Sequence, residues 1–430
     1  MGQARIFGQT AAGGSSSGST LTVHAEEGST ITVAKDEKSY TSTDNPAVFK
    51  RLEDGTWNAT AGKEGKNPVS QSIELCTNYV MNLNAKIYGI SCDITAPSPH
   101  WTRTHDAVGF NATASVGTVA GESDFDTIYP WSEMKRETLS TGDVMVKIPK
   151  FYYQRYRDGN IEHINITDRA LDGFSLHPLF DRPDGERDYA YVGAYKTSSN
   201  NKSVSGAIVQ VSQTRATMRD NARKKGVGWS LIDISALSAI QMLFLVEFAT
   251  NDSQTAIGAG RTKATTATTT GLCDTVPNLT GTTYGNNQEA NVVYRGFEDL
   301  WGNVWEFVDG VNWVDGSYYV CNDPNNYTDD TSFGYEKLEF TGGTSWNDRF
   351  IIEAGFNWEK NRHIMLPATA TGGSNSTYQC DTASGASGWR VLEHGGDWSS
   401  GNSAGLFCSA MNSASTATSN AVSSRLLYLP

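Results

Sequence analysis

The sequence predicts an α+β protein in which a small all-β sandwich precedes a larger domain of strands, loops and two helices. The 430-residue chain is only 38% hydrophobic and 19% charged and contains 42 glycines, a mixture that suits loop-rich β structure. Short runs of alternating apolar and polar residues recur before residue 84, as in strands with one buried face. Helical periodicity is confined to residues 213–248. A chain of this length is long enough for two or three domains.

The first 18 residues are rich in Gly, Ser and Ala, and we expect them to be a flexible linker or attachment segment. Residues 19–84 follow as the predicted sandwich of five to seven strands, with a turn at Asp54-Gly55. The segment Phe49–Trp57 resembles the F-x-x-L-x-x-G-x-W signature of small immunoglobulin-like or prealbumin-like modules. This resemblance implies a spacer.

Two helices are predicted in the larger domain, residues 85–430. The first covers roughly residues 213–225 and ends at Gly226. The second covers about 232–248, with Ser230 and Asp233 forming a capping box before it. Its buried side is marked by Leu237, Ile240, Phe244 and Phe248.

The stretch 294–310 is expected to organise the larger domain. Trp301, Trp305 and Val308 have helical spacing, but Gly302-Asn303 lies between them and breaks a regular helix. We therefore predict a buried irregular turn. Its carboxylates would accept hydrogen bonds from buried backbone donors, which is the favoured interpretation, or act as acid and base, or bind calcium. These carboxylates are Glu298, Asp299, Glu306 and Asp309.

Composition excludes several functions. The net charge of -13 and the lack of a long basic run argue against nucleic-acid and anionic-membrane partners. The most apolar segment, residues 237–249, is too short to span a bilayer, and the N-terminus has no apolar run typical of a signal peptide. The six cysteines lack zinc spacing, so we expect free thiols, no required cofactor and synthesis in a reducing compartment.

Residues 397–424 are dominated by Ser, Asn, Ala and Thr, with Leu406-Phe407 and Leu426–Leu429 as apolar anchors. Because a disordered tail would not end in such an apolar run, we predict a polar, structured surface loop closed by a C-terminal strand.

Two motifs, Trp301–Phe307 and Gly395–Trp398, resemble those of the formylglycine-generating enzyme and sulfatase-modifying family. Ser423–Arg425 stands where that family's closing G-F-R usually lies and departs from it. The resemblance implies a C-type-lectin-like fold. It implies no oxidase activity, because Ser400 and Gly405 stand where that family's two cysteines would be. We therefore expect no enzyme. The family's turn binds calcium, which implies a possible structural calcium site. Its ligands would be the carbonyls of Asp299, Gly302 and Val304 and the side chain of Glu306.

The segment 390–407 more closely resembles the R-V-L-x-x-G-G-S-W-x-x-G-x-x-A-G-L-F block of diversity-generating retroelement variable proteins and related phage tail-tip proteins. Residues 390–430 would then be the variable region. The resemblance extends over residues 85–430, with Asp397 as a departure from the usual Ser. It implies outward ligand-binding positions at Asp397, Ser399, Ser400, Asn402, Ser403, Ser409, Met411, Asn412 and Ser415.

This second resemblance implies a phage or prophage tail-tip protein that binds a bacterial surface receptor, either protein or glycan. Its N-terminus would contact other tail proteins, its oligomeric state would be a homotrimer, and its location the virion tail. Two alternatives remain: a fixed Ser/Asn-rich loop in a tail protein that is not diversified, and a calcium-dependent glycan lectin.

Overall fold

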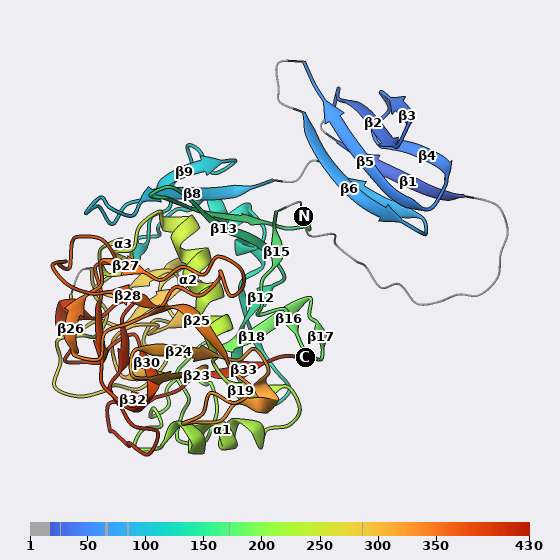
Figure 1. Cartoon of the computed structure of the whole chain (residues 1–430). Coiled ribbons are helices and arrows are strands. Elements are labelled where there is room, and N and C mark those ends of the chain that lie inside the picture. The colour runs from blue at the N-terminus through green and yellow to red at the C-terminus, as the bar shows by residue number, and fades with distance from the viewer. Residues whose placement is uncertain (1–17, 26, 65–67, 84–85, 172, 286) are drawn as a thin grey trace. The chain divides into compact units, whose positions relative to one another are not determined.

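The computed structural model describes residues 18–430 except 26, 65–67, 84–85, 172 and 286. The expected linker, residues 1–18, therefore lies almost entirely outside the described residues. The chain divides into two compact units, one from residues 1–86 and 167–175 and the other from residues 87–166 and 176–430. The structure is mostly β, with few helices (Figure 1). Among the described residues, no helix is long and apolar enough to cross a membrane.

The first unit consists of two sheets around one core. Its strands are β1 (Ser19–His24), β2 (Thr30–Lys35), β3 (Lys38–Ser42), β4 (Ala47–Leu52), β5 (Gly55–Gly62), β6 (Val69–Leu75) and β7 (Tyr79–Asn82). One sheet has the order β4-β1-β7 and the other β3-β2-β5-β6. Leu21 and Val23 from the first sheet and Val33 and Trp57 from the second share a single buried cluster. These two sheets over one core match the sandwich arrangement that alternation predicted for this segment.

Two five-stranded sheets and one larger sheet form most of the second unit. The order β15-β13-β14-β8-β9 comprises Ser175–Leu176, Tyr152–Asp158, Ile161–Thr167, Tyr88–Asp93 and Thr102–His105. The order β11-β12-β18-β33-β19 comprises Lys135–Thr138, Val144–Pro149, Tyr189–Gly193, Leu426–Tyr428 and Trp229–Leu231. The largest sheet, β25-β24-β23-β30-β31-β29-β26, comprises Glu336–Thr341, Ser317–Val320, Trp305–Val314, Trp389–His394, Ser409–Met411, Thr382–Gly385 and Trp346–Phe350, with β32 (Val422–Ser423) beside β23.

Shorter strands and helices complete the second unit. The small sheets contain β10 (Ser115–Val116), β20 (Gly281–Thr282), β21 (Val292–Tyr294), β22 (Phe297–Glu298), β16 (Asp181–Arg182), β17 (Gly185–Glu186), β27 (Glu353–Ala354) and β28 (Pro367–Thr369). The α-helices are α1 (Arg215–Arg223), α2 (Ile234–Phe248) and α3 (Ser253–Ala256). The 3-10 helices are η1 (Asp124–Thr127), η2 (Trp131–Glu133), η3 (Pro277–Leu279), η4 (Pro324–Asn326) and η5 (Gly401–Ser403).

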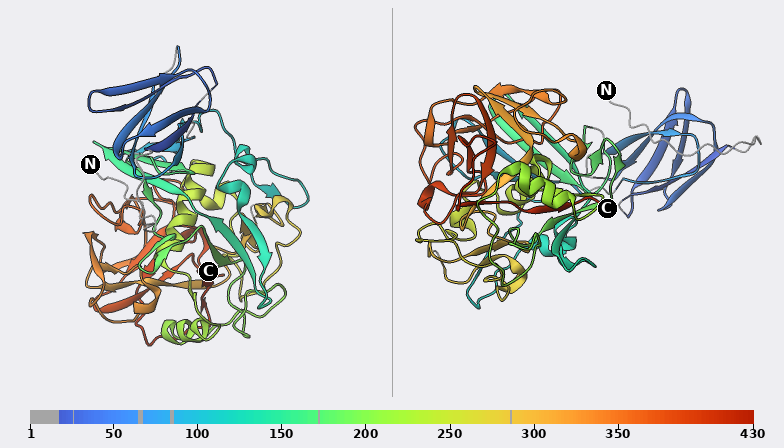
Figure 2. Two further views of the ribbon diagram at one scale, coloured as in Figure 1. Left: turned by 90° about the vertical axis from the view of Figure 1, so that its right-hand side faces the viewer. Right: turned by 90° about the horizontal axis from the view of Figure 1, so that it is seen from below.

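Helix α2 is the interior element of the second unit, whereas α1 lies at its periphery (Figures 1 and 2). Asp233 caps the N-terminus of α2 by accepting from the Ala236 amide, so the predicted start is confirmed to within about two residues. The predicted capping box is wrong, because Ser230 lies in strand β19 and its hydroxyl donates to the Leu231 carbonyl. The prediction that only one side of α2 is buried is wrong. Every residue of α2 except Phe248 is buried, because strands and loops cover the helix on all sides.

The predicted buried turn at Gly302-Asn303 is confirmed. Asp299, Gly302 and Asn303 all have positive φ, at 55°, 77° and 66°. At Gly302 an added Cβ would lie 2.8 Å from the carbonyl oxygen of Arg261, so only glycine fits this close approach. Trp301 is fully buried, and its indole donates to the Gly258 carbonyl at 3.0 Å. The chain then continues as strand β23, not as a helix.

Leu243→Ala in α2 should lower the free energy of unfolding of the second unit by about 2–5 kcal/mol, because it leaves a cavity in a fully buried position. Tryptophan fluorescence during denaturant unfolding measures this effect, since every tryptophan except Trp57 lies in the second unit. Leu272→Ala is the matched control, because Leu272 is 46% exposed. Equal losses in the two variants would contradict the interior position of α2.

Candidate functional site

Glu306, at the start of β23, is buried and bonded to two cationic side chains. Its Oε1 accepts from Lys196 Nζ at 2.9 Å and from Arg425 Nη2 at 2.6 Å. All three residues are at most 1% exposed. Burial alone would raise the pKa of Glu306, but Arg425 and Lys196 outweigh it and hold that pKa at about 2. The Glu306 carboxylate is therefore ionised, and Lys196 and Arg425 balance its negative charge.

These contacts decide how well the expected calcium ligands fit a metal ion. The Glu306 carboxylate is already shared by an ammonium and a guanidinium group. The same guanidinium also approaches the Asp299 carbonyl at 3.4 Å and the Glu298 carbonyl at 2.7 Å. A calcium shell needs several oxygens that face no competing cation. The residues present therefore do not fit the calcium site at Asp299, Gly302, Val304 and Glu306 that the family resemblance implied.

The other three carboxylates of the stretch 294–310 have different partners. Glu298 accepts from the backbone amides of Gly271 and Cys273, at 2.6 and 2.7 Å, as the favoured interpretation predicted. Its burial and the neighbouring Asp299 raise its pKa to about 8. The side chain of Asp299 instead accepts mainly from side-chain amides, and that of Asp309 accepts from an arginine. The backbone-donor interpretation thus holds chiefly for Glu298.

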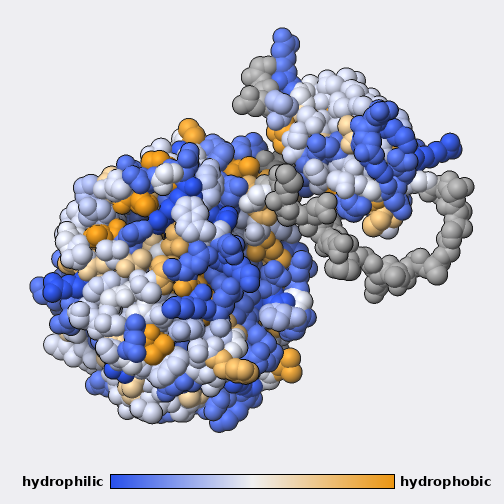
Figure 3. All heavy atoms as spheres, in the orientation of Figure 1, coloured by the Kyte–Doolittle hydropathy of each residue, from blue (hydrophilic) through white to orange (hydrophobic). Residues whose placement is uncertain are grey.

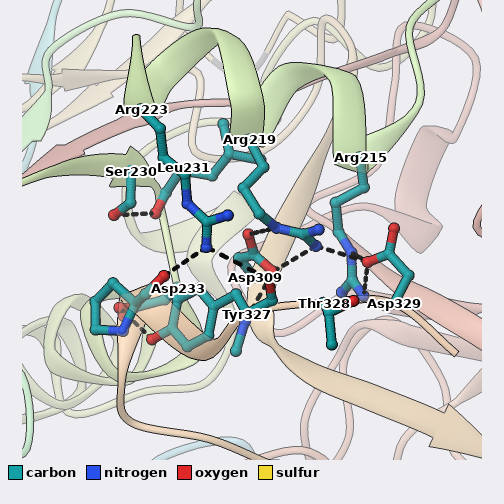
Figure 4. Close-up of polar contacts among 12 residues, drawn as sticks. Arg215, Arg219, Arg223, Ser230, Leu231, Asp233, Asp309, Tyr327, Thr328 and Asp329 are labelled. Carbon is teal, nitrogen blue, oxygen red and sulfur yellow. Dashed lines mark hydrogen bonds and ion pairs between the residues drawn. The ribbon is translucent and has the colours of Figure 1, made fainter. Parts of the chain in front are cut away.

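Three arginines spaced four residues apart on α1 hold the helix against β23 and the loop between β24 and β25 (Figure 4). Arg219 donates to both carboxylate oxygens of Asp309, at 2.6 and 2.9 Å. Arg215 and Arg219 both donate to Asp329 at 2.6 Å, and Arg223 donates to a carbonyl in the same loop. Ion pairs as well as apolar contacts therefore hold helix α1 in place. The helical periodicity of its sequence did not indicate these ion pairs.

The buried turn directly supports the loop that follows β30. The Gly302 amide donates to the Gly395 carbonyl at 3.2 Å, and the Trp398 amide donates to the Asn303 carbonyl at 3.1 Å. The Asn303 side chain in turn accepts from a backbone amide of the 260–270 loop at 2.9 Å. The conformation of residues 395–398 thus depends on the turn beneath it.

Asp397 closes this loop on itself. Its Oδ1 accepts from the Ser399 amide at 2.8 Å, from Ser399 Oγ at 2.9 Å and from Ser400 Oγ at 3.0 Å. Of the predicted outward residues here, Ser399 and Asn402 are exposed, and Asp397, Ser400 and Ser403 are half-buried. We define residues 397–403 as the candidate loop.

The expected outward positions of Ser409 and Met411 are wrong. They are 3% and 0% exposed, because β31 is an inner strand between β29 and β30 and both of its faces are covered. Asn412 is exposed and Ser415 is half-buried, with the Ser415 hydroxyl bonded to Asp330.

The predicted residues therefore form two groups. The candidate loop follows His394 at the end of β30, whereas residues 412–415 lie beside the earlier part of that strand, where the Val391 amide donates to the Ser413 carbonyl. Three strand residues separate these two points, which places the groups roughly 10 Å apart along β30.

The candidate loop borders a polar surface hollow of about 290 Å³. The hollow is lined by Asp252, Gln254, Thr255, Ala259, Gln288, Asn375 and Asn402. Gln288 donates to the Asn402 side-chain oxygen at 2.7 Å, and Gln254 donates to the Gly401 carbonyl at 3.1 Å. Sequence reasoning identified only Asn402 here. Gln254 and Thr255 lie on the short helix α3 and the other residues lie in loops. None of these segments had a recognisable motif, and the fold brings them together.

Gly405 stands where the formylglycine-generating family has one of its two cysteines. A Cβ added at Gly405 would lie 2.0 Å from Asp381 Oδ1, so this position has no room for a thiol side chain. Cys408 is fully buried, and burial raises the pKa of its thiol well above the ordinary value.

On the face drawn in Figure 3, hydrophobic residues of the second unit are scattered among hydrophilic ones.

Comparisons with known proteins leave the assignment open. No protein-family model matches the sequence, and no curated protein matches it. Among solved structures, the chain is similar to the "Major Tropism Determinant U1 Variant", with 12% identity and a TM-score of 0.27. That match covers 88% of this chain and 82% of the other. At this TM-score the similarity does not decide the fold.

The Glu393 side chain, buried on β30 beneath the second group, should make stability depend on pH. Burial raises the pKa of Glu393 from 4.5 to about 7. Its contribution to stability is present below pH 4.5 and is lost as the pH rises through 7, because the folded state retains the proton longer than the unfolded state. Between pH 5 and 8, the free energy of unfolding should therefore fall by about 2–3 kcal/mol more in the wild-type protein than in Glu393→Gln.

Denaturant unfolding at both pH values measures this difference. Other buried groups such as Glu298 titrate alike in both proteins and cancel. The same substitution at the exposed Glu289 is the control. Parallel losses in wild type and Glu393→Gln would show that Glu393 is ionised in the folded protein.

Proposed function

We propose that this protein is a receptor-binding protein of a phage or prophage tail, which contacts a bacterial surface ligand through the candidate loop and the adjoining hollow. The observation that carries this proposal is the position of Asn402, an exposed side chain at the rim of an open polar hollow. The resemblance of residues 390–407 to variable proteins and tail-tip proteins supports the same role. We also propose that the second unit is C-type-lectin-like.

The lining of the hollow favours particular ligands. Four side-chain amides and one carboxylate surround it, and its lining contains neither Lys nor Arg. Amides offer both donors and acceptors, which suits hydroxyl groups and peptide groups. The carboxylate and the net charge of -13 disfavour anions. The ligand is thus a neutral or cationic polar group on a surface protein or glycan.

A binding role is favoured over catalysis. The buried Cys408 is held as an unreactive thiol, and Ser400 and Gly405 stand where an oxidase of the formylglycine type would need cysteines. A calcium-dependent lectin is disfavoured by the cations that already surround Glu306.

Diversification remains part of the proposal for the exposed positions. Ser399, Asn402 and Asn412 are exposed, so their replacement would leave the buried cores untouched. Homotrimer formation and attachment to other tail proteins through the N-terminus are further proposals, as is a location on the virion. A nearby reverse transcriptase and a near-copy of the coding segment for 390–425, differing at adenines, would support diversification.

Asn402→Ala should weaken binding of fluorescently labelled full-length protein to a susceptible bacterial strain by at least about tenfold. The loss is expected because Asn402 lies at the rim of the hollow. Binding is measured by flow cytometry across a panel of strains, with titration on each strain that binds the wild-type protein. Asn160→Ala is the matched control, since Asn160 is exposed in the turn between β13 and β14. Asn412→Ala reports whether the second group also contacts the ligand.

Pretreatment of the cells identifies the receptor class. Loss of binding after periodate indicates a glycan, and loss after protease indicates a protein. Wild-type-level binding by Asn402→Ala on every strain would overturn the proposed site. Absence of binding by the wild-type protein to every strain in a panel spanning diverse surface types would overturn the function.

A further inference from the structure

Lys196 lies in the segment that follows strand β18, which ends at Gly193. It is 1% exposed, and its ammonium lies 2.9 Å from Glu306 Oε1. Burial lowers the pKa of Lys196, while Glu306 opposes this shift by favouring the charged form. A charged lysine buried this fully without a carboxylate partner would destabilise the folded protein.

Arg425 approaches the same carboxylate from the C-terminal segment. Its Nε lies 3.0 and 3.3 Å from the two Glu306 oxygens. Its remaining groups donate to the Gly193 carbonyl at 2.8 Å and the Glu298 carbonyl at 2.7 Å. Glu306 thus joins the end of β18, the start of β23 and the segment before β33 in one cluster.

The charges of this cluster leave no place for a divalent ion. Lys196 and Arg425 bring two positive charges to the Glu306 carboxylate, and Asp299 is the further carboxyl group that interacts with Lys196. Burial raises the pKa of Asp299. At a given distance from a cation, a divalent ion is repelled twice as strongly as a monovalent one. An added Ca²⁺ would therefore be repelled by both neighbouring cations.

We infer that the Lys196 ammonium is the structural cation of this turn, and that the fold needs no divalent metal here. The side chain supplies the positive charge that a bound ion would otherwise supply, and it does so from a fixed position in the chain. Folding, and the support of the candidate loop, are then independent of the calcium concentration.

The first test measures thermal unfolding of the full-length protein with EDTA, with excess calcium chloride and with neither. The expected result is the same midpoint in all three, because a metal that bound only the folded state would raise it. Calorimetric titration of the wild-type protein with calcium chloride is expected to show no calcium binding at Glu306. Any binding heat that is seen should be unchanged in Glu306→Gln. A midpoint that EDTA lowers in wild type but not in Glu306→Gln would overturn the inference.

The second test removes the ammonium while keeping most of the side-chain volume. Lys196→Met should lower the unfolding midpoint clearly, because Glu306 then loses one of its two cations. Lys224→Met is the control, as Lys224 is exposed on the far end of α1. The double variant Lys196→Met/Glu306→Gln should recover part of the loss, since the two charges are then removed together.

Additive effects of the two substitutions would mean that Lys196 does not act through Glu306 and would overturn the inference. If Lys196→Met does not fold, the chelation and titration of the wild-type protein still decide between an internal cation and a bound metal.

Discussion

A carboxylate cannot remain ionised inside a protein without a compensating charge, and Glu306 imposes this constraint on the whole second unit. Its two cationic partners come from positions 110 residues before it and 119 residues after it. The start of the long strand β23 therefore depends on contacts with both the segment after β18 and the C-terminal segment. The turn above this cluster then supports the candidate loop through backbone hydrogen bonds.

Local signals in the sequence predicted the features that depend on local physics. Gly302-Asn303 breaks the helical period because the backbone there needs positive φ, and Asp233 marks the start of α2 because its side chain caps the first turn. The alternation of residues 19–84 likewise follows from strands with one covered face.

Long-range partnerships could not be predicted in this way. Nothing near Lys196 or Arg219 in the chain indicates which carboxylate each meets, because these pairs are set by the tertiary fold. The misplaced Ser409 and Met411 have a related cause. The resemblance to variable proteins implied that these two positions face outward, but the tertiary fold covers β31 on both faces. The hollow was missed because its residues converge from helix α3 and separate loops.

The second unit combines a tightly determined interior with a permissive edge. Helix α2 is buried, and the Glu306 cluster and the arginines of α1 form buried ion pairs. Substitutions at these positions are therefore poorly tolerated. The candidate loop, which follows β30, and residues 412–415, which follow β31, instead present small polar side chains.

The turn that Asp397 closes has a consequence for how the protein can evolve. Because the carboxylate of Asp397 binds the Ser399 amide, the backbone there is held by a group that does not depend on the identity of the side chain at 399. Asn402 is linked to the rest of the unit by one side-chain hydrogen bond, from Gln288. Under the proposed function, single substitutions at these two positions would alter the ligand contacts without requiring a compensating change elsewhere in the chain.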